Sequence, residues 1–352
     1  MNTENQPAKN KLSPYLPARG AWALALGTSI GWGSLVVTSN SYLSQAGPLG
    51  SVLGLLAGAL IMILISRNYH YMINRYPDAG GVYTFTKETF GCDHGFLTAW
   101  FLALTYLAML WANATALPLF ASYFFGNIFR FGRLYSFFGY EVYAGEVLLT
   151  VAGIILATAL CRQHRRITAR MMTVMAIVIC LGITVCFAAS VITRGGFAGL
   201  FEPAFLPDKN ELSQIILIAS ISPWAFIGFE NISHSAEEFD FPRSKVFRIL
   251  TLSVLSAAIL YIFVLLLSVS AYPPEYGSWM EYIRDLGSLD GIKGLPAFYA
   301  ADHYLGRFGV DLLIVSLLAL ILTSLIGNTT ALSRLFYALA KDEILCPKDS
   351  RN

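Results

Sequence analysis

Long apolar runs that are almost free of charge limit this chain more than any other feature. Each is about 20 residues long, which is the length of helix that crosses the hydrocarbon core of a bilayer. Only 13% of the 352 residues are charged and 56% are hydrophobic, whereas a soluble domain is about a quarter charged. We therefore predict an all-α polytopic membrane protein.

Eight segments are predicted to cross the membrane, at residues 20–45, 48–66, 95–124, 144–161, 171–192, 212–234, 247–271 and 307–338. Only seven of the 24 Lys and Arg residues fall in the loops on one side, and the rest fall on the side that holds both ends of the chain. Because cytoplasmic loops carry the excess of Lys and Arg, this bias predicts that both termini are cytoplasmic. The expected location is the plasma (inner) membrane.

Three glycines interrupt the first apolar segment, which reads LALGTSIGWG from Leu24 to Gly33. Gly costs up to about 1 kcal/mol relative to Ala inside a helix, so Gly27, Gly31 and Gly33 disfavour a continuous helix. A break in a membrane helix exposes N–H groups that suit an anion and carbonyls that suit a cation. We interpret this stretch as half of a site for a zwitterion.

A second interrupted span lies five spans later. Pro223 has no N–H and clashes with the carbonyl of Ala219, and Gly228 follows it. Either break alone would favour a simple kink, because Pro and Gly are common in membrane helices. Paired interrupted spans at matching positions of two halves favour a transporter site built on inverted repeats.

Three side chains near the second break have two possible roles each. Glu230 is the only carboxylate well inside a predicted span, where a charge costs on the order of 2.5–3.5 kcal/mol. It could be a protonatable or gating group, or a buried carboxyl that binds the backbone near the first break. Trp224 and Phe226 flank the second break and could form an aromatic lid over a substrate or simply pack.

Polar residues of two other spans could face the same cavity. Tyr106 and Asn113 are seven residues apart and therefore share one face of the third span, although such residues mostly bridge helices. Polar side chains of the eighth span could hold Na⁺, but Ser and Thr in membrane helices mostly bond their own backbone. These residues are Thr323, Ser324, Asn328, Thr329 and Thr330.

The loop between the second and third spans contains a turn at Pro77–Gly81 followed by a short amphipathic segment. It could be an interfacial connector or an inner gate element. The five His and five Cys residues show no ligand spacing, and no nucleophile–base set is present. We predict no metal site, no cofactor and no enzymatic activity. The expected partners are a small-molecule substrate and the lipid bilayer, with no nucleic acid, and the oligomeric state stays open.

Four stretches together match a known family pattern: the glycine cluster at 27–33, PDAGGVY at 77–83, FIGFE at 226–230 with EFDFPR at 238–243, and SRLFYALAKD at 333–342. With them the chain resembles the permeases of the amino acid–polyamine–organocation (APC) superfamily over essentially its whole length. The resemblance implies a five-plus-five inverted-repeat fold and alternating access for an amino acid or related amine.

The resemblance also implies a division of the chain. Residues 20–192 would be the first repeat, with spans one to five, and residues 212–338 an incomplete second repeat, with spans six to eight. Residues 1–19 would be a cytoplasmic leader and residues 339–352 a cytoplasmic tail. The fold needs ten core helices and eight are found, so we expect a fragment, a truncated product or a chain that needs a partner.

By the same resemblance, the substrate carboxylate would meet the N–H groups of Gly31, Trp32 and Gly33. The amine would meet carbonyls near Ile30 and around Trp224. Trp224 would stand where relatives place a gating aromatic residue. Glu230 is the second expected gating or coupling residue, on the ground of its position inside a span. The full set of expected substrate-binding residues is Thr28, Ser29, Ile30, Gly31, Trp32, Gly33, Tyr106, Asn113, Trp224, Phe226 and Ile227.

The predicted function is a secondary active transporter or exchanger of an amino acid or related amine. The alternative is a non-transporting sensor or a truncated permease that binds without cycling. Some proton-coupled relatives carry a lysine in the fifth span, and residues 171–192 contain no charged residue. Proton coupling through another group, sodium coupling and simple exchange all stay open.

Overall fold

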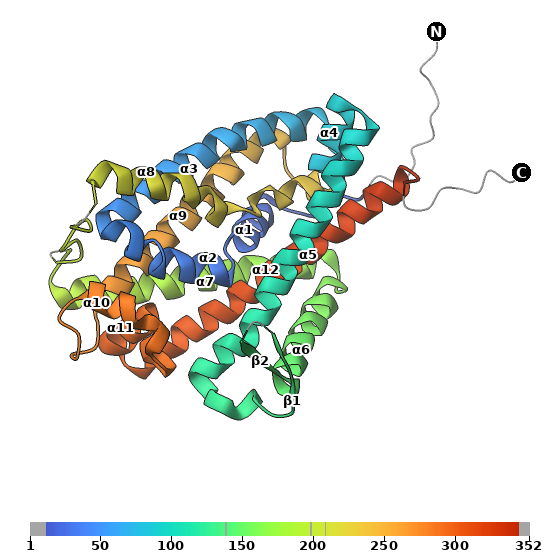
Figure 1. Ribbon diagram of the computed structural model, residues 1–352. Coiled ribbons are helices and arrows are strands. Elements are labelled where there is room, and N and C mark those ends of the chain that lie inside the picture. Colours follow the sequence, from blue (N-terminus) through green and yellow to red (C-terminus); the bar gives the residue numbers. More distant parts are fainter. Residues whose placement is uncertain (1–11, 138, 198, 208, 345–352) are drawn as a thin grey trace, which may run out of the picture.

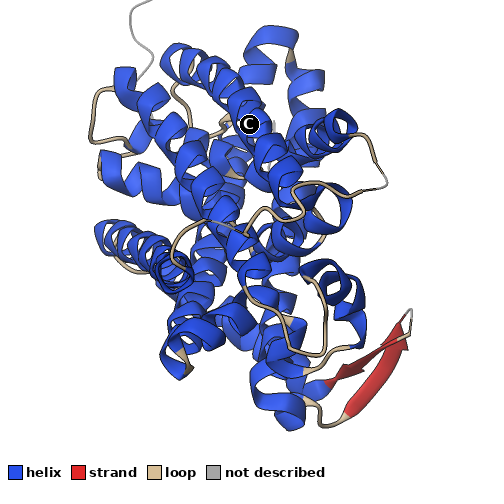
Figure 2. Cartoon of the chain, turned by 90° about the vertical axis from the view of Figure 1, so that its left-hand side faces the viewer, coloured by secondary structure: helices blue, strands red, loops and turns tan. Residues whose placement is uncertain are grey.

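The computed structural model describes residues 12–137, 139–197, 199–207 and 209–344. Figures 1 and 2 show that these residues form a helical body with a short hairpin at one edge, which confirms the predicted all-α architecture. Within them, seven helical segments are long and apolar enough to cross a membrane. These segments are Leu43–Arg75, Cys92–Phe129, Ala144–Cys161, Arg165–Arg194, Glu211–Glu238, Arg243–Ser270 and Arg307–Lys341.

The first predicted span is divided into two short helices, so it is absent from those seven. α1 (Ala18–Ser29) has 12 residues and α2 (Trp32–Asn40) has 9. Seven of the eight predicted crossings coincide with the seven continuous segments, and the remaining one, residues 20–45, contains α1 and α2. The break that the glycine cluster predicted is therefore confirmed.

Two helices extend beyond the apolar windows that predicted them. α3 (Leu43–Arg75) continues past residue 66, and α5 (Cys92–Phe125) begins before residue 95. Both extensions contain mostly polar residues, so a search for apolar segments does not include them. α3 also bends at Gly47, whose φ of +63° interrupts the helix near its start.

The sixth span is broken as predicted. It consists of α8 (Glu211–Ile221), the 3₁₀ segment η2 (Ser222–Phe226) and the 3₁₀ segment η3 (Phe229–Glu238). Long 3₁₀ runs are uncommon and often mark a hinge or strain. The other helices are α4 (Val82–Phe90), α6 (Ala144–Cys161), α7 (Arg165–Arg194), α9 (Val246–Ser270), α10 (Trp279–Asp285), α11 (Pro296–Leu305) and α12 (Arg307–Lys341). Short 3₁₀ turns are η1 (Gly126–Phe129), η4 (Arg243–Lys245), η5 (Leu286–Ser288) and η6 (Gly291–Gly294).

A two-stranded antiparallel hairpin was not predicted. β1 (Arg133–Phe137) pairs with β2 (Tyr140–Tyr143) in the loop before α6. Its side chains are mostly exposed, so the strands bury no apolar face against the helices. Arg133 and Glu141 form an ion pair of 2.9 Å across the hairpin.

Small residues allow α1 to lie deep in the molecule against α12. A β-carbon at Gly27 would lie 2.7 Å from the Thr323 Cβ, and one at Gly327 would collide with the Thr28 methyl group. Close helix approach through small residues is the usual packing in membranes. Gly27 therefore serves the packing of an intact helix, and the break itself lies at Ile30 and Gly31.

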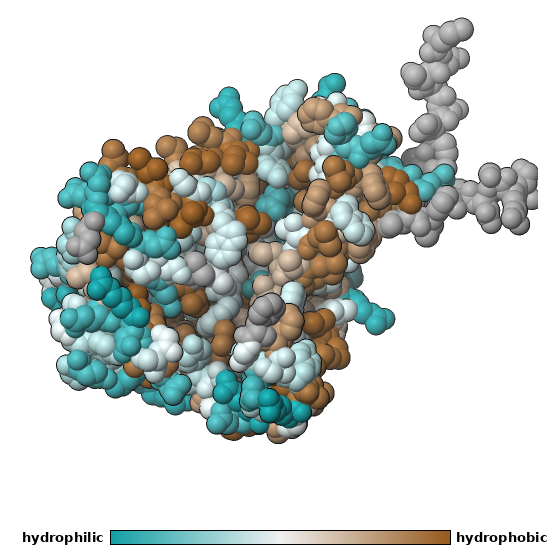
Figure 3. Space-filling view, in the orientation of Figure 1, coloured by the Kyte–Doolittle hydropathy of each residue, from teal (hydrophilic) through white to brown (hydrophobic). Residues whose placement is uncertain are grey.

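The surface has the division expected of a membrane protein. Figure 3 shows apolar side chains in broad patches over the helices, and hydrophilic ones gathered near α10 and α11. Exposed apolar residues include Leu60 and Leu64 of α3 and Trp100 and Trp111 of α5. α4 and the C-terminal end of α12 lie at the opposite end of the molecule from α10 and α11 (Figure 1).

Candidate substrate site

The first break separates two backbone segments of opposite polarity. α1 ends at Ser29, Ile30 is extended with φ −88° and ψ 102°, and α2 begins at Trp32. The Ser29 hydroxyl donates to the Leu26 carbonyl at 3.0 Å, so it satisfies the backbone of its own helix. Ile30 is fully buried. The polar groups of this break are therefore mainly backbone carbonyls on one side and N–H groups on the other.

The second break turns at Gly228. η2 ends at Phe226, Ile227 is extended with ψ 135°, and Gly228 has φ +108°. Pro223 lies in the first turn of η2, where its missing N–H costs no helical hydrogen bond. The Glu230 carboxylate binds the backbone of this turn, since its Oε2 accepts the Gly228 N–H at 2.7 Å.

The two breaks touch each other. The Thr28 hydroxyl lies 2.6 Å from the Gly228 carbonyl oxygen and 2.6 Å from that of Leu24. A β-carbon at Gly228 would collide with the Thr28 carbonyl oxygen and lie 2.8 Å from its carbon. Both the positive φ and this close approach require glycine at position 228.

A tyrosine from α9 joins the carbonyls of both breaks. The Tyr261 hydroxyl lies 2.6 Å from the Ala225 carbonyl oxygen and 3.3 Å from that of Ser29. The ring of Phe226 packs edge-on against the Tyr261 ring, with centroids 5.7 Å apart. Tyr261 was not predicted, although a hydroxyl in the middle of an apolar span needs a partner and could have indicated it.

Asn113 of α5 caps the first turn of α2. Its Oδ1 accepts the Trp32 backbone N–H at 3.1 Å, and its Nδ2 donates to the Met109 carbonyl at 2.9 Å. A β-carbon at Gly31 would lie 2.9 Å from Asn113 Oδ1. Asn113 thus lies at the first break, as its expected site role requires.

Tyr106 lies on the same helix but contacts a different element. Its hydroxyl is 2.8 Å from His234 Nε2, and His234 Nδ1 is 2.9 Å from the Ala79 carbonyl oxygen. A carbonyl only accepts, so the ring proton lies on Nδ1 and Tyr106 donates to Nε2. This chain of hydrogen bonds links α5, η3 and the turn before α4. His234 was not among the predicted site residues, because a single His carries no pattern.

The two aromatic residues of the second break differ in exposure. Trp224 is 49% exposed, whereas Phe226 is fully buried. Trp224 lies beside the start of α2, since a β-carbon at Gly33 would be 3.7 Å from its ring. Ile227 ends η2 and donates its N–H to the Trp224 carbonyl at 3.2 Å. Trp224 therefore lies partly exposed beside the first break, and Phe226 is part of the core.

The polar residues of α12 mostly bond within their own helix. The hydroxyls of Thr323 and Thr330 donate to carbonyls three or four residues earlier, and Asn328 Nδ2 donates to the Ser324 carbonyl. Asn328 Oδ1 accepts from Asn231 at 3.2 Å. These contacts support the helix-bonding interpretation of the eighth span.

A small cavity lies beside the start of α2, between α2, α9 and α11. It is lined by Trp32, Val36 and Phe298 and has a volume of ≈ 30 Å³, roughly the volume of one water molecule. The edge-on packing of Trp32 against Phe120 covers the start of α2. This cavity is too small for an amino acid, and no residue of the second break lines it.

Crossed ion pairs join the loop around α4 to the end of α12. Lys341 Nζ lies 3.0 Å from Asp78 Oδ2, and Lys87 Nζ lies 2.7 Å from Asp342 Oδ2. The Tyr83 hydroxyl also donates to Asp342, at 2.6 Å. Two of the motif stretches noted in the sequence therefore bind each other. α4 is a docked element and not a free surface connector.

Burial acts to raise the pKa of Asp78. The hydrogen bond from the Gly80 N–H and the neighbouring Lys341 ammonium outweigh it and hold the pKa below its ordinary value. The carboxylate therefore stays ionised and paired near neutral pH.

Glu238, at the end of η3, joins three further elements through its carboxylate and its backbone carbonyl. Glu238 is fully buried and accepts from Arg334 of α12 at 2.6 Å and from Arg165 of α7 at 2.8 Å. The backbone N–H groups of Tyr15 and Leu16 donate to the Glu238 carbonyl, each at 2.9 Å. The segment before α1 is thereby held against the end of the second broken span.

The amino acid permease family model matches residues 20–348. This chain belongs to the amino acid permease family. The match covers both broken spans and the ion pairs between α4 and α12, and it confirms the resemblance to APC permeases.

Several curated relatives are similar along much of the chain. An arginine/ornithine antiporter of Pseudomonas aeruginosa is 25% identical over 339 residues, which is 92% of this chain and 63% of that protein. A vacuolar cationic amino acid transporter of Arabidopsis thaliana is 25% identical over 96% of this chain and 54% of its own length. The uncharacterized amino acid permease YtnA of Bacillus subtilis is 23% identical over 78% of this chain and 57% of that protein. The chain thus spans between about half and two thirds of the length of these relatives.

Proposed function

We propose that this permease moves an amino acid or related amine across the membrane as a secondary transporter or exchanger, by alternating access. The observation that carries the proposal is the meeting of two broken helices, at the Thr28 hydroxyl and the Gly228 carbonyl. Half-helix ends inside a membrane present N–H groups and carbonyls without a charged side chain. Such a pair of ends is complementary to a zwitterion.

In this mechanism the substrate replaces two protein contacts. Its carboxylate accepts hydrogen bonds from the N–H groups at the start of α2, including the Trp32 N–H, which donates to Asn113 in this structure. Its amine takes carbonyls near Ser29 and Ala225, where the Tyr261 hydroxyl now lies. Because the protein already pairs these groups, substrate binding exchanges hydrogen bonds and exposes no unpaired backbone.

Two residues are assigned to gating and coupling. Trp224 is half exposed beside the start of α2, so it can cover or uncover the substrate. Glu230 holds the Gly228 turn through its carboxylate, so a change in its protonation would loosen the second break. The two repeats of the proposed transporter are residues 20–192 and 212–338, each beginning with a broken span.

The proposed setting is the plasma (inner) membrane, with both ends of the chain and α4 on the cytoplasmic side. The excess of Lys and Arg in the loops of that side supports this orientation. Uptake in liposomes with imposed gradients distinguishes coupling to H⁺, coupling to Na⁺ and exchange.

The test is uptake by the purified chain in liposomes. The substrate panel contains labelled arginine, ornithine, an aromatic amino acid and the decarboxylated amine of arginine, each with an imposed proton gradient, a sodium gradient or internal amino acid. We expect accumulation of one substrate class that depends on one of these conditions. Trp224→Ala is the matched variant, and we expect slower uptake at nearly unchanged thermal stability.

Two results would contradict the proposal. If substrates raise the thermal unfolding midpoint of the chain but none accumulates under any gradient, the chain is a binding protein or needs further segments to cycle. If no substrate either binds or accumulates, the assignment of the two breaks as a site fails.

A further inference from the structure

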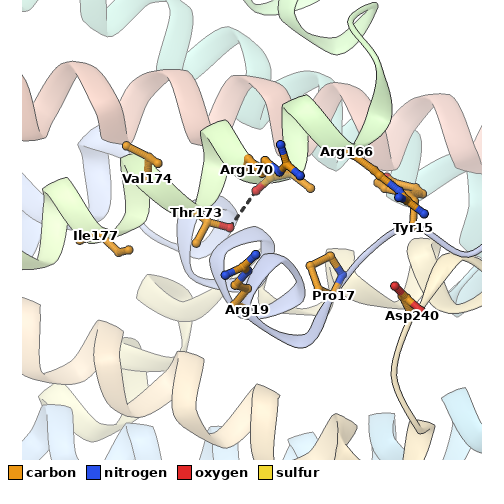
Figure 4. Close-up of a pocket in the computed structure, with 10 residues that line it drawn as sticks. Tyr15, Pro17, Arg19, Arg166, Arg170, Thr173, Val174, Ile177 and Asp240 are labelled. Atoms are coloured by element: carbon orange, nitrogen blue, oxygen red, sulfur yellow. Dashed lines mark hydrogen bonds between the residues drawn. The ribbon is translucent and has the colours of Figure 1, made fainter.

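A large cavity lies on the outer surface of the helical body, away from the two breaks. It has a volume of ≈ 480 Å³ and opens between α7 and the first turn of α1. Figure 4 shows three arginines around it, Arg19 from α1 and Arg166 and Arg170 from α7. They lie at the end of the molecule that carries the ion pairs between α4 and α12.

The three guanidinium groups have no partner among the residues that the structure describes. None of the three makes an ion pair or a hydrogen bond with another residue that the structure describes. Their neighbour Arg165 differs, because it binds Glu238 and lies over the Tyr15 ring. Like charges around one cavity repel each other unless an anion lies between them.

One acidic side chain also lines the cavity, Asp240 from the loop after η3. The lining holds this one carboxylate and three guanidinium groups, so its positive charge stays in excess. Arginine presents a planar fork of donors that fits phosphate oxygens in pairs. The polar end of the cavity therefore suits a phosphate group.

The other end of the cavity is apolar and reaches the membrane surface of α7. Val174 and Ile177 line it and are 59% and 44% exposed. With Arg166 and Arg170 they follow one face of the helix, and at 1.5 Å per residue the face from Arg166 to Ile177 is roughly 16 Å long. The hydroxyl of Thr173, which lies between Arg170 and Val174 in the sequence, donates to the Ala169 carbonyl. A ligand with a phosphate at one end and acyl chains at the other matches this lining.

We propose that this cavity binds the headgroup of an anionic phospholipid from the leaflet on the α4 side. Arg19, Arg166 and Arg170 hold the phosphate, and the acyl chains run along Val174 and Ile177. Basic pockets at the cytoplasmic ends of membrane helices bind such headgroups. Because Arg19 belongs to α1 and the other two to α7, the bound lipid ties the half-helix before the first break to the body of the protein.

The experiment compares three forms of the chain in neutral detergent. They are the wild type, the cavity variant R19Q/R166Q/R170Q, and a control variant R67Q/R243Q/R248Q that removes three exposed arginines elsewhere at the same end. The thermal unfolding midpoint is measured with phosphatidylglycerol or phosphatidylcholine at equal mole fraction, and retained lipid is counted by native mass spectrometry. Each single cavity substitution is included, so that poor folding of the triple variant does not prevent a decision.

We expect phosphatidylglycerol, but not phosphatidylcholine, to raise the midpoint of the wild type and of the control variant by several degrees. The shift and the retained lipid should be lost in the cavity variant and reduced in each single variant. Equal shifts in all three forms, or equal losses in the cavity and control variants, would overturn the site. Inorganic phosphate or glycerophosphoglycerol producing the whole shift would overturn the lipid as its ligand. No substrate is used, so the outcome is independent of the proposed transport function.

Discussion

The Trp32 backbone N–H donates to Asn113 Oδ1 at 3.1 Å, so a side chain of α5 caps the second half of a broken helix. The start of a helix carries a partial positive charge, and a neutral amide oxygen is a weaker partner there than a carboxylate. The proposed substrate therefore competes for a group that the protein already satisfies.

Asn113→Asp should weaken amino acid binding by at least about tenfold, which corresponds to about 1.4 kcal/mol. The new carboxylate would occupy the position of the substrate carboxylate and repel it. A decarboxylated amine lacks that group, so its binding should fall much less. Equilibrium binding of arginine and of its decarboxylated amine is compared for both forms. Equal losses of affinity for the two ligands would show that the substrate carboxylate does not bind at the start of α2.

Gly228→Ala should prevent stable folding or lower the free energy of unfolding by more than about 3 kcal/mol, as a clash with backbone leaves no easy relaxation. The β-carbon would collide with the Thr28 carbonyl, and Gly228 has φ +108°. The control is Gly195→Ala, since Gly195 has φ +77° with nothing within 4 Å of its β-carbon. Thermal unfolding of both variants separates the clash from the backbone strain that they share. Similar losses of stability in the two variants would mean that the close contact between Gly228 and Thr28 adds nothing beyond the shared backbone strain.

Tyr261→Phe should slow transport while it destabilises the fold by only about 1 kcal/mol, the net value of a typical hydrogen bond. The substitution keeps the ring that packs on Phe226 and removes the hydroxyl between the two breaks. Tyr282→Phe is the matched control, because the Tyr282 hydroxyl also donates to a carbonyl, that of Lys293, at 2.6 Å. Uptake rate and unfolding midpoint are measured for both. If the two variants transport equally well, the Tyr261 hydroxyl has only a structural role.

Reversal of one charge in the α4–α12 contact should destabilise the protein, and reversal of both should restore it. In Lys87→Glu or Asp342→Lys alone, two like charges face each other in place of the 2.7 Å ion pair. The double variant re-forms an opposite pair and should recover roughly half of the lost unfolding midpoint or more, as coupled neighbours do. Thermal unfolding at low and high salt is the measurement. No recovery in the double variant would show that shape, and not charge, holds α4.

Acid should remove the stabilising contribution of Asp78. Its pKa is held below the ordinary value in the folded chain, so its contribution is present above the unfolded value of about 3.9 and is lost as the pH falls further. The difference in unfolding midpoint between the wild type and Asp78→Asn should therefore be largest near neutral pH and shrink below about pH 4. Asp93→Asn, an exposed position on α5, is the control. A difference that does not change with pH would exclude the titration of Asp78.

The sequence by itself predicted the apolar segments that are long enough to cross a membrane, and the positions of both breaks. Hydropathy counts spans directly, because a segment in lipid has no alternative to being apolar. Gly31, Pro223 and Gly228 marked the breaks, since each disfavours a regular helix for a local reason. Helical spacing also singled out Asn113 with Tyr106, but the structure places only Asn113 at the first break, and Tyr106 contacts His234.

Only the tertiary structure decided which groups meet at those breaks. Tyr261, His234 and Glu238 act through partners far away in the chain, at Ser29, Ala79 and Arg334. Nothing local in the sequence specifies such pairings, because they depend on how helices pack around α1. The cavity lined by arginines also depends on helix packing, since Arg19 and Arg170 lie around it only when α1 packs against α7.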